Sequence, residues 1–294
     1  MWQGNKHWET SRLNIHNTLI VPLLFTLTAA LPGISPRADV APPDWRQKQS
    51  DKVWEEKIRH EVFGDRNIIV GAAQNVLEIK APYRAEDATV VPISIHTKIP
   101  QSPEKYIRKI HVFIDKNPVP LVGTFTFTPD SGKADLAMRV RVDDQTYIRA
   151  IAEMNNGDLY MTKSFIRATG ACSAPPPKSI DDSIANMGKM KLKTIGKLEL
   201  DKPNLVQLMI KHPNITGLQP MKIGSRVMPP AHFINEISVD FDGKPVMKAQ
   251  LTFSVSMDPS FRFFFVPEKE GVIHVEATDT KSNHWTSEYK IEKI

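Results

Sequence analysis

Cysteine is almost absent from this sequence: its 294 residues include only one, Cys172. A single cysteine has no partner for a disulfide bond within its own chain, so its thiol is free, capped or joined to another molecule. Dithiol redox motifs and covalent haem attachment both need two cysteines close together, and both are therefore excluded.

Catalytic and metal-binding motifs are missing as well. The sequence contains no G-x-S-x-G elbow and no phosphate-binding G-x-x-x-x-G-K-[ST] loop. Its nine histidines show neither H-x-H nor H-E-x-x-H spacing, so no local pattern predicts a metal site. We therefore expect a protein that is not an enzyme and uses no metal and no cofactor.

Charge of one sign is not concentrated anywhere. The 38 Lys and Arg residues are interspersed with 33 Asp and Glu residues, which leaves a net charge of only +5. A dedicated nucleic-acid surface needs clustered basic residues, so nucleic acid is not an expected partner.

The first 41 residues have the order of a secretory signal and leader. Lys6 and Arg12 precede an apolar stretch from Leu19 to Leu31, and a Pro-rich segment with small residues follows. The stretch is shorter than the roughly 20 residues that cross a bilayer, so we expect cleavage, export and no membrane contact afterwards. Cleavage near Ala30 and near Ala38 both stay open, and the alternative is a short internal helix.

The hydrophobic pattern after the leader predicts one short helix followed by strands. Trp54, Ile58 and Val62 recur at helical spacing, and from about residue 90 the apolar residues alternate with period two. In one such strand the alternation places Arg139 and Arg141 opposite the apolar face, where we expect both guanidinium groups in water.

A Pro-rich segment divides the strand-forming sequence into two halves. Three prolines follow Cys172 closely, and the composition predicts a linker over residues 173–188 between domains at 42–172 and 189–294. The second half has a clear hairpin with Asp242-Gly243 at its turn, in which Pro245 must occupy an edge or a bulge. The predicted fold is all-β, with two β-sandwich domains.

The segment around Cys172 predicts an exposed, flexible arm. Its neighbours Gly170, Ala171 and Ser173 are small, whereas a buried cysteine normally lies among bulky apolar residues. Arg167 and Lys178 would favour the reactive thiolate if they folded back onto it. An incidental linker thiol and a homodimer linked through Cys172 are the alternatives.

Five stretches resemble the sulfur-carrier pair SoxYZ, here fused in one chain from about Val53 to Ile291. The SoxY-like stretches are Ala88 to Ile93, Ile114 to Leu121 and Gly170-Ala171-Cys172, and the SoxZ-like ones are His212 to Leu218 and Pro230 to Ile234. The resemblance implies immunoglobulin-like sandwiches, a periplasmic location and a part in sulfur metabolism such as thiosulfate oxidation. By position Cys172 would hold sulfur intermediates covalently while sulfur-oxidising enzymes or c-type cytochromes act on them. A SoxZ-like half contributes no catalytic residue.

The arm departs from the family pattern. The family has a Gly-Gly-Cys-Gly-Gly tail at a free C-terminus, whereas here only Gly170 remains and the chain continues through Ser173. The arm must therefore act as a loop held at both ends. Fused proteins of this type resemble those associated with quinoprotein alcohol dehydrogenases. The alternative function is thus a non-catalytic binding or assembly module for such a dehydrogenase or its cytochrome.

Overall fold

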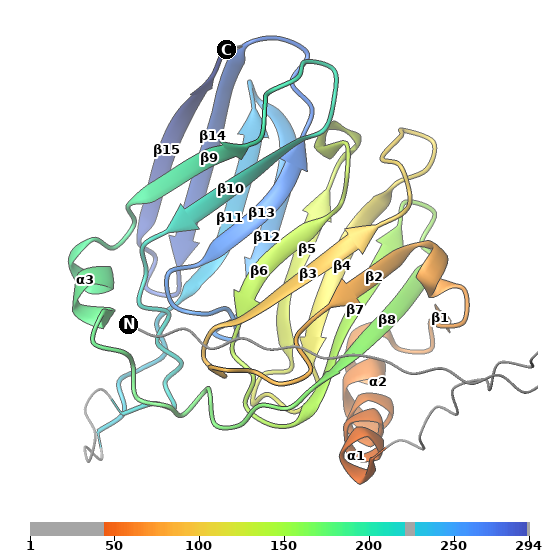
Figure 1. The fold of residues 1–294 in the computed structure, drawn as a ribbon, viewed down its shortest axis with the longest axis vertical. Coiled ribbons are helices and arrows are strands. Elements are labelled where there is room, and N and C mark those ends of the chain that lie inside the picture. The colour runs from red at the N-terminus through yellow and green to blue at the C-terminus, as the bar shows by residue number, and fades with distance from the viewer. Residues whose placement is uncertain (1–43, 221–226, 293–294) are drawn as a thin grey trace, which may run out of the picture. The chain divides into compact units, whose positions relative to one another are not determined.

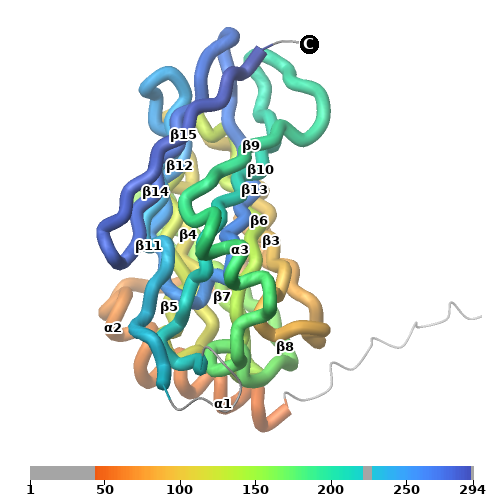
Figure 2. The backbone as a smooth tube through the Cα atoms, turned by 90° about the vertical axis from the view of Figure 1, so that its left-hand side faces the viewer, coloured from red at the N-terminus to blue at the C-terminus, as the bar shows by residue number. Residues whose placement is uncertain are grey.

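Two β-sheets stacked face to face form the described part of the chain. The computed structural model describes residues 44–220 and 227–292, so the expected signal and leader lie outside the described residues. Figure 2 shows the two layers, with β11, β12, β14 and β15 in one and β9, β10 and β13 in the other. No described helix is long and apolar enough to cross a membrane.

Within the described residues the larger sheet has nine strands and the smaller has six. The larger sheet runs in the order β1 (Ile68–Ile69), β8 (Leu159–Ile166), β7 (Thr146–Met154), β4 (Ile107–Ile114), β5 (Leu121–Phe127), β12 (Lys244–Leu251), β11 (Ile234–Phe241), β14 (Gly271–Asp279) and β15 (His284–Ile291). The smaller sheet runs in the order β2 (Leu77–Lys80), β3 (Val91–Thr97), β6 (Leu136–Val140), β13 (Ser260–Phe265), β10 (Asn204–Ile210) and β9 (Met190–Ile195).

Both sheets continue from the first half of the chain into the second (Figure 1). In the larger sheet β5 pairs antiparallel with β12, from Phe127 opposite Met247 to Gly123 opposite Leu251. In the smaller sheet β6 pairs with β13, where Met138 lies opposite Phe261. One continuous apolar core fills the space between the sheets. The all-β fold class with two immunoglobulin-like halves is confirmed, and the halves lie edge to edge.

The predicted N-terminal helix is present and is longer than its pattern indicated. It comprises α1 (Trp45–Val53), a π-helical segment (Trp54–Ile58) and α2 (Arg59–Phe63). Trp54 and Ile58 are buried as expected, but the inward position of Val62 is wrong: its side chain is 45% exposed and Phe63 is buried instead. The wider π turn adds a residue to the helix and rotates the following turn.

This helix covers the outer face of the larger sheet. Trp54, Ile58 and Phe63 pack on Phe113 of β4 and on residues of β7 and β8. The alternating pattern of β4 predicted a half-buried strand, yet both of its faces are buried there because the helix supplies a second cover.

A buried ion pair fixes the helix to the sheet. Arg149 of β7 donates from Nε to Asp115 at 2.9 Å and from Nη2 to Asp51 of α1 at 2.7 Å. Its guanidinium also lies over the Trp54 ring, 4.8 Å from the centroid. Arg149 and Asp115 are both about fully buried, so each charge depends on the other.

The predicted hairpin of the second half is confirmed in its turn and its bulge. Asp242 and Gly243 both have positive φ, at 49° and 80°, as a tight two-residue hairpin turn requires. The pairing of β11 with β12 shifts register between Val239 and Asp240, and Pro245 lies opposite Asp240 at this bulge. Proline thereby avoids the ladder position that needs an N–H donor.

The predicted linker is extended only in its first part. Residues 173–179 form neither helix nor strand, as the three prolines require. A short helix, α3 (Ile180–Ala185), then begins inside the range that was expected to be linker, and Ile180 is buried.

Candidate functional site

Cys172 is buried, so the predicted exposure of its arm is wrong for this conformation. Its residue is 1% exposed, and its neighbour Ala171 is equally buried. Only Gly170 and Ser173, on either side, face solvent. The reason lies in the same small side chains that predicted exposure: they let the arm fit closely between two other segments of the chain. Those segments are distant in sequence, so the residues next to Cys172 could not predict that they cover it.

Three hydrogen bonds hold the arm in place. Gly170, with φ of 74°, donates its backbone N–H to the carbonyl of Asp143 at 2.7 Å. The N–H of Cys172 is donated to Oδ1 of Asp143 at 2.9 Å. On the other side, Oγ1 of Thr216 donates to the carbonyl of Cys172 at 2.7 Å. Asp143 belongs to the first half and Thr216 to the second, so the thiol lies where the two halves meet.

The buried thiol is in its neutral form. Burial, together with the neighbouring Asp143 carboxylate, raises the pKa of Cys172 to about 12, while Arg141 opposes the shift. A thiolate is the form that attacks and carries sulfur, so the closed arm protects this sulfur from reaction. Arg167, which would favour the thiolate if it folded back onto Cys172, pairs with Asp44.

Arg141 is buried, which corrects the prediction that its guanidinium group lies in water. Arg139, two residues earlier, is partly exposed, but Arg141 is only 4% exposed. Its Nη2 donates to the backbone carbonyl of Asn214 at 2.9 Å, and its Nε is buried without a hydrogen-bond partner. The alternating pattern assumed an uncovered sheet face, whereas the loop at 212–219 covers this end of it.

That loop contains one of the two stretches that resembled SoxZ, and it pairs with the other. Ile215 and His232 form an isolated antiparallel bridge, and each donates its N–H to the other's carbonyl. Asn214, at a φ of 41°, donates from Nδ2 to Val255 and Ser256 and accepts from the N–H of Ile234. The two stretches are therefore one structural unit, which positions Thr216 on the arm.

Two histidines and one aspartate that sequence spacing did not connect lie together beside this unit. The ligand atoms of His212, His232 and Asp279 are within 4.8 Å of one another, and all three residues are buried. Oδ2 of Asp279 lies 2.5 Å from Nε2 of His232 and 3.3 Å from Nε2 of His212. These donor types suit a divalent metal. Their hydrogen bonds nevertheless satisfy one another without an ion, and no sequence motif could have found a cluster that spans 67 residues.

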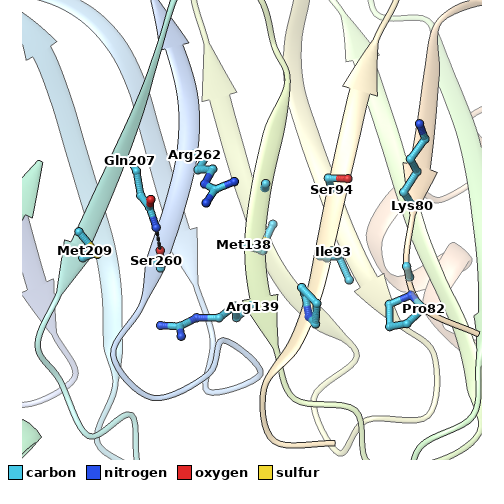
Figure 3. A pocket seen from close by; sticks show the side chains of 13 residues that line it. Lys80, Pro82, Ile93, Ser94, Met138, Arg139, Gln207, Met209, Ser260 and Arg262 are labelled. Atoms are coloured by element: carbon cyan, nitrogen blue, oxygen red, sulfur yellow. Dashed lines mark hydrogen bonds between the residues drawn. The ribbon is translucent and has the colours of Figure 1, made fainter. Parts of the chain in front are cut away.

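An open groove of about 620 Å³ crosses the outer face of the smaller sheet (Figure 3). Its lining comes from both halves, from Lys80 at the end of β2 to Gln207 and Met209 of β10. Lys80, Arg139 and Arg262 supply positive charge, and none of the described lining residues is acidic. The floor is largely apolar. Such a surface is suited to an anionic partner with some apolar contact.

Two family models match the chain. The model of the sulfur oxidation protein SoxY matches residues 59–172, and that of the sulphur oxidation protein SoxZ matches residues 193–290. The chain belongs to the SoxYZ family, with both partners in one polypeptide. The SoxY match ends on Cys172 itself, and the SoxZ match contains Thr216 and the three residues of the histidine cluster.

Solved structures give weaker likenesses to this SoxYZ chain. The sulfur carrier protein SoxY from Chlorobium limicola f thiosulfatophilum is 23% identical, with 42% of this chain and all 100% of that chain covered and a TM-score of 0.34. The superoxide reductase (neelaredoxin) from Ignicoccus hospitalis is 16% identical, with 34% and 94% covered and a TM-score of 0.31. Scores this low carry no functional conclusion. No curated protein matches the chain.

Proposed function

We propose that this SoxYZ protein is a non-catalytic carrier that holds a sulfur-containing intermediate covalently on Cys172 and presents it to partner enzymes. The observation that carries the proposal is that the SoxY match ends at the one cysteine in the chain. Sulfur-oxidising enzymes or c-type cytochromes of the periplasm are the proposed partners, and residues 1–41 are the proposed export signal and leader.

Carriage requires the arm to have two positions. In the closed position described here the thiol is neutral and cannot be reached by an enzyme, because Cys172 is 1% exposed. Attachment and removal of cargo therefore belong to an open position, in which the arm leaves Asp143 and Thr216. The exposed Gly170 has no atom within 4 Å of the place of a Cβ, which leaves room for the backbone to turn there.

The mass of the protein from its native cells tests this proposal. We expect intact protein from a periplasmic extract to carry a sulfur-containing addition that maps to Cys172, and to begin after the leader. The Cys172→Ser variant should lack the addition and fail to complement a deletion strain. An unmodified thiol under every growth condition, together with full complementation by Cys172→Ser, would refute carriage.

The groove favours a second function, that of a binding module for a quinoprotein dehydrogenase or its cytochrome. Its three cations and apolar floor offer a surface that needs no thiol. A pull-down from periplasmic extract separates the two functions. Capture that survives Cys172→Ser but is lost in Arg262→Glu supports the module, whereas capture that is lost with the thiol supports carriage.

A further inference from the structure

Arg141 and Cys172 span the same gap between two segments of the chain. The first segment is residues 141–143, from which the side chain of Arg141 reaches the carbonyl of Asn214 in the second segment. The backbone of Cys172 is held by Asp143 of the first segment and Thr216 of the second. The side chain of Arg141 and the backbone of Cys172 are therefore two parallel links between segments 141–143 and 214–216.

The hydrogen bonding of Arg141 is incomplete in the closed position. A guanidinium group has five N–H donors, yet among the described residues only Nη2 has an acceptor, at 2.9 Å. Arg141 also forms no ion pair with any described carboxylate, although it is 4% exposed, and the Asp87 carboxylate acts on it only through longer-range electrostatics. Buried cations are normally paired, so this arrangement calls for a missing anion.

The thiol in its present form is not that anion. Burial raises the pKa of Cys172 to about 12, which leaves it uncharged near neutral pH. The influence between the two groups is nevertheless mutual, because a thiolate at Cys172 would raise the pKa of Arg141 and Arg141 lowers that of the thiol. A negative charge placed on Cys172 would thus be felt by Arg141.

We propose that Arg141 is a positioning residue that receives the anionic end of an adduct on Cys172, so that the closed arm is where a charged adduct is held between visits to partners. The inference rests on the proposed carrier function. An adduct that ends in a sulfonate supplies three acceptor oxygens for the free donors of the guanidinium group. The Asp143 carboxylate beside the arm disfavours any anion, and the charge of Arg141 offsets it.

Two adducts of Cys172 on the purified full chain, one charged and one neutral, distinguish the effect of the adduct's charge from the effect of its size. With excess tetrathionate, the Cys172 thiolate attacks a central sulfur, the central S–S bond breaks and thiosulfate leaves, which gives Cys–S–S–SO3⁻. Tetrathionate is the oxidant in this step: the cysteine sulfur is oxidised, and the half of tetrathionate that leaves is reduced to thiosulfate. With methyl methanethiosulfonate, the same thiolate displaces methanesulfinate and gives the neutral Cys–S–S–CH3. Intact mass confirms one adduct per chain, since no other cysteine is present.

Hydrogen–deuterium exchange at the Cys172 amide then reports how firmly the arm is closed, because this N–H is donated to Asp143. We expect protection in the charged adduct to exceed that in the neutral adduct by about tenfold, as for one charge-assisted hydrogen bond. In Arg141→Gln this ratio should fall to about one, and in Arg141→Lys it should take an intermediate value because the planar fork is lost. Arg139→Gln, which alters the arginine two residues earlier in β6, should leave the ratio unchanged.

A ratio of one or less in the wild-type protein would overturn the inference, even if Arg141→Gln failed to fold. A ratio that persists in Arg141→Gln would overturn it as well. Comparing ratios removes any general loss of stability, since that would affect both adducts equally. A cellular adduct on Cys172 combined with a ratio of one would reject only the role of Arg141, whereas a ratio of ten without any cellular adduct would reject only the carrier function.

Discussion

Loss of the Thr216 hydroxyl should open the arm. Oγ1 of Thr216 donates the one hydrogen bond that ties Cys172 to the second half of the chain, at 2.7 Å, and Thr216 is itself buried. The Thr216→Val substitution keeps the shape of the side chain but leaves the Cys172 carbonyl without its donor. A lost buried hydrogen bond costs about 1 to 2 kcal/mol, which raises the open fraction about 5- to 30-fold.

The rate of alkylation of Cys172 measures this fraction. In the closed wild-type protein, a pKa of about 12 in place of the ordinary 9.0 lowers the thiolate fraction about a thousandfold at pH 8, so that modification by iodoacetamide must proceed through opening. Intact mass followed over time should show modification of Thr216→Val about 5- to 30-fold faster. Thr194→Val, which alters an exposed residue of β9, is the control and should react like wild type. Folded Thr216→Val that reacts at the wild-type rate would refute the clamp.

Three further predictions follow from buried charges. Asp143→Asn should keep the acceptor for the Cys172 N–H but remove a negative charge that raises the thiol pKa, so the pKa of the closed thiol, followed by the ultraviolet absorbance of its thiolate, should fall. Arg149→Met should leave Asp115 buried and unpaired and lower the free energy of unfolding in urea by about 3 to 5 kcal/mol. Burial lowers the pKa of His212 to about 4 from 6.5, so the unfolded chain binds the extra proton and stability should fall by up to about 3 kcal/mol as pH falls from about 6.5 to 4. His212→Gln should flatten that slope in the same urea titrations.

Local patterns predicted most of the architecture because strands and turns are encoded within a few residues. Leu208 and Ile210 of β10 are two residues apart, as period two requires for one face of a strand, and both are buried. Asp242-Gly243 encoded its hairpin turn through backbone conformations that these two residues adopt readily. The candidate cysteine was also identifiable from sequence, since it is unique in the chain.

The environment of that cysteine could not be predicted, because it is made by segments far apart in sequence. Asp143 lies 29 residues before Cys172, and Thr216 lies 44 residues after it. Arg141 was placed in water on the assumption that one face of its strand is uncovered. The loop that carries Asn214 covers Arg141 instead. The spacing of apolar residues in either segment gives no indication of that contact.

The closed arm is held weakly enough to open, as the proposed carrier function requires. Its three hydrogen bonds contribute about 1 kcal/mol each, and the prolines that follow have no N–H to add more. At any time, at most about one molecule in a hundred then has an open arm. If a partner binds only the open arm, its apparent affinity is lower than its intrinsic affinity by this open fraction. A substitution that increases the open fraction therefore increases the apparent affinity by the same factor. The gain in alkylation rate caused by Thr216→Val must therefore equal the gain in partner affinity measured by calorimetry. Faster alkylation with unchanged affinity would mean that the partner docks on the closed molecule and draws the cysteine out afterwards.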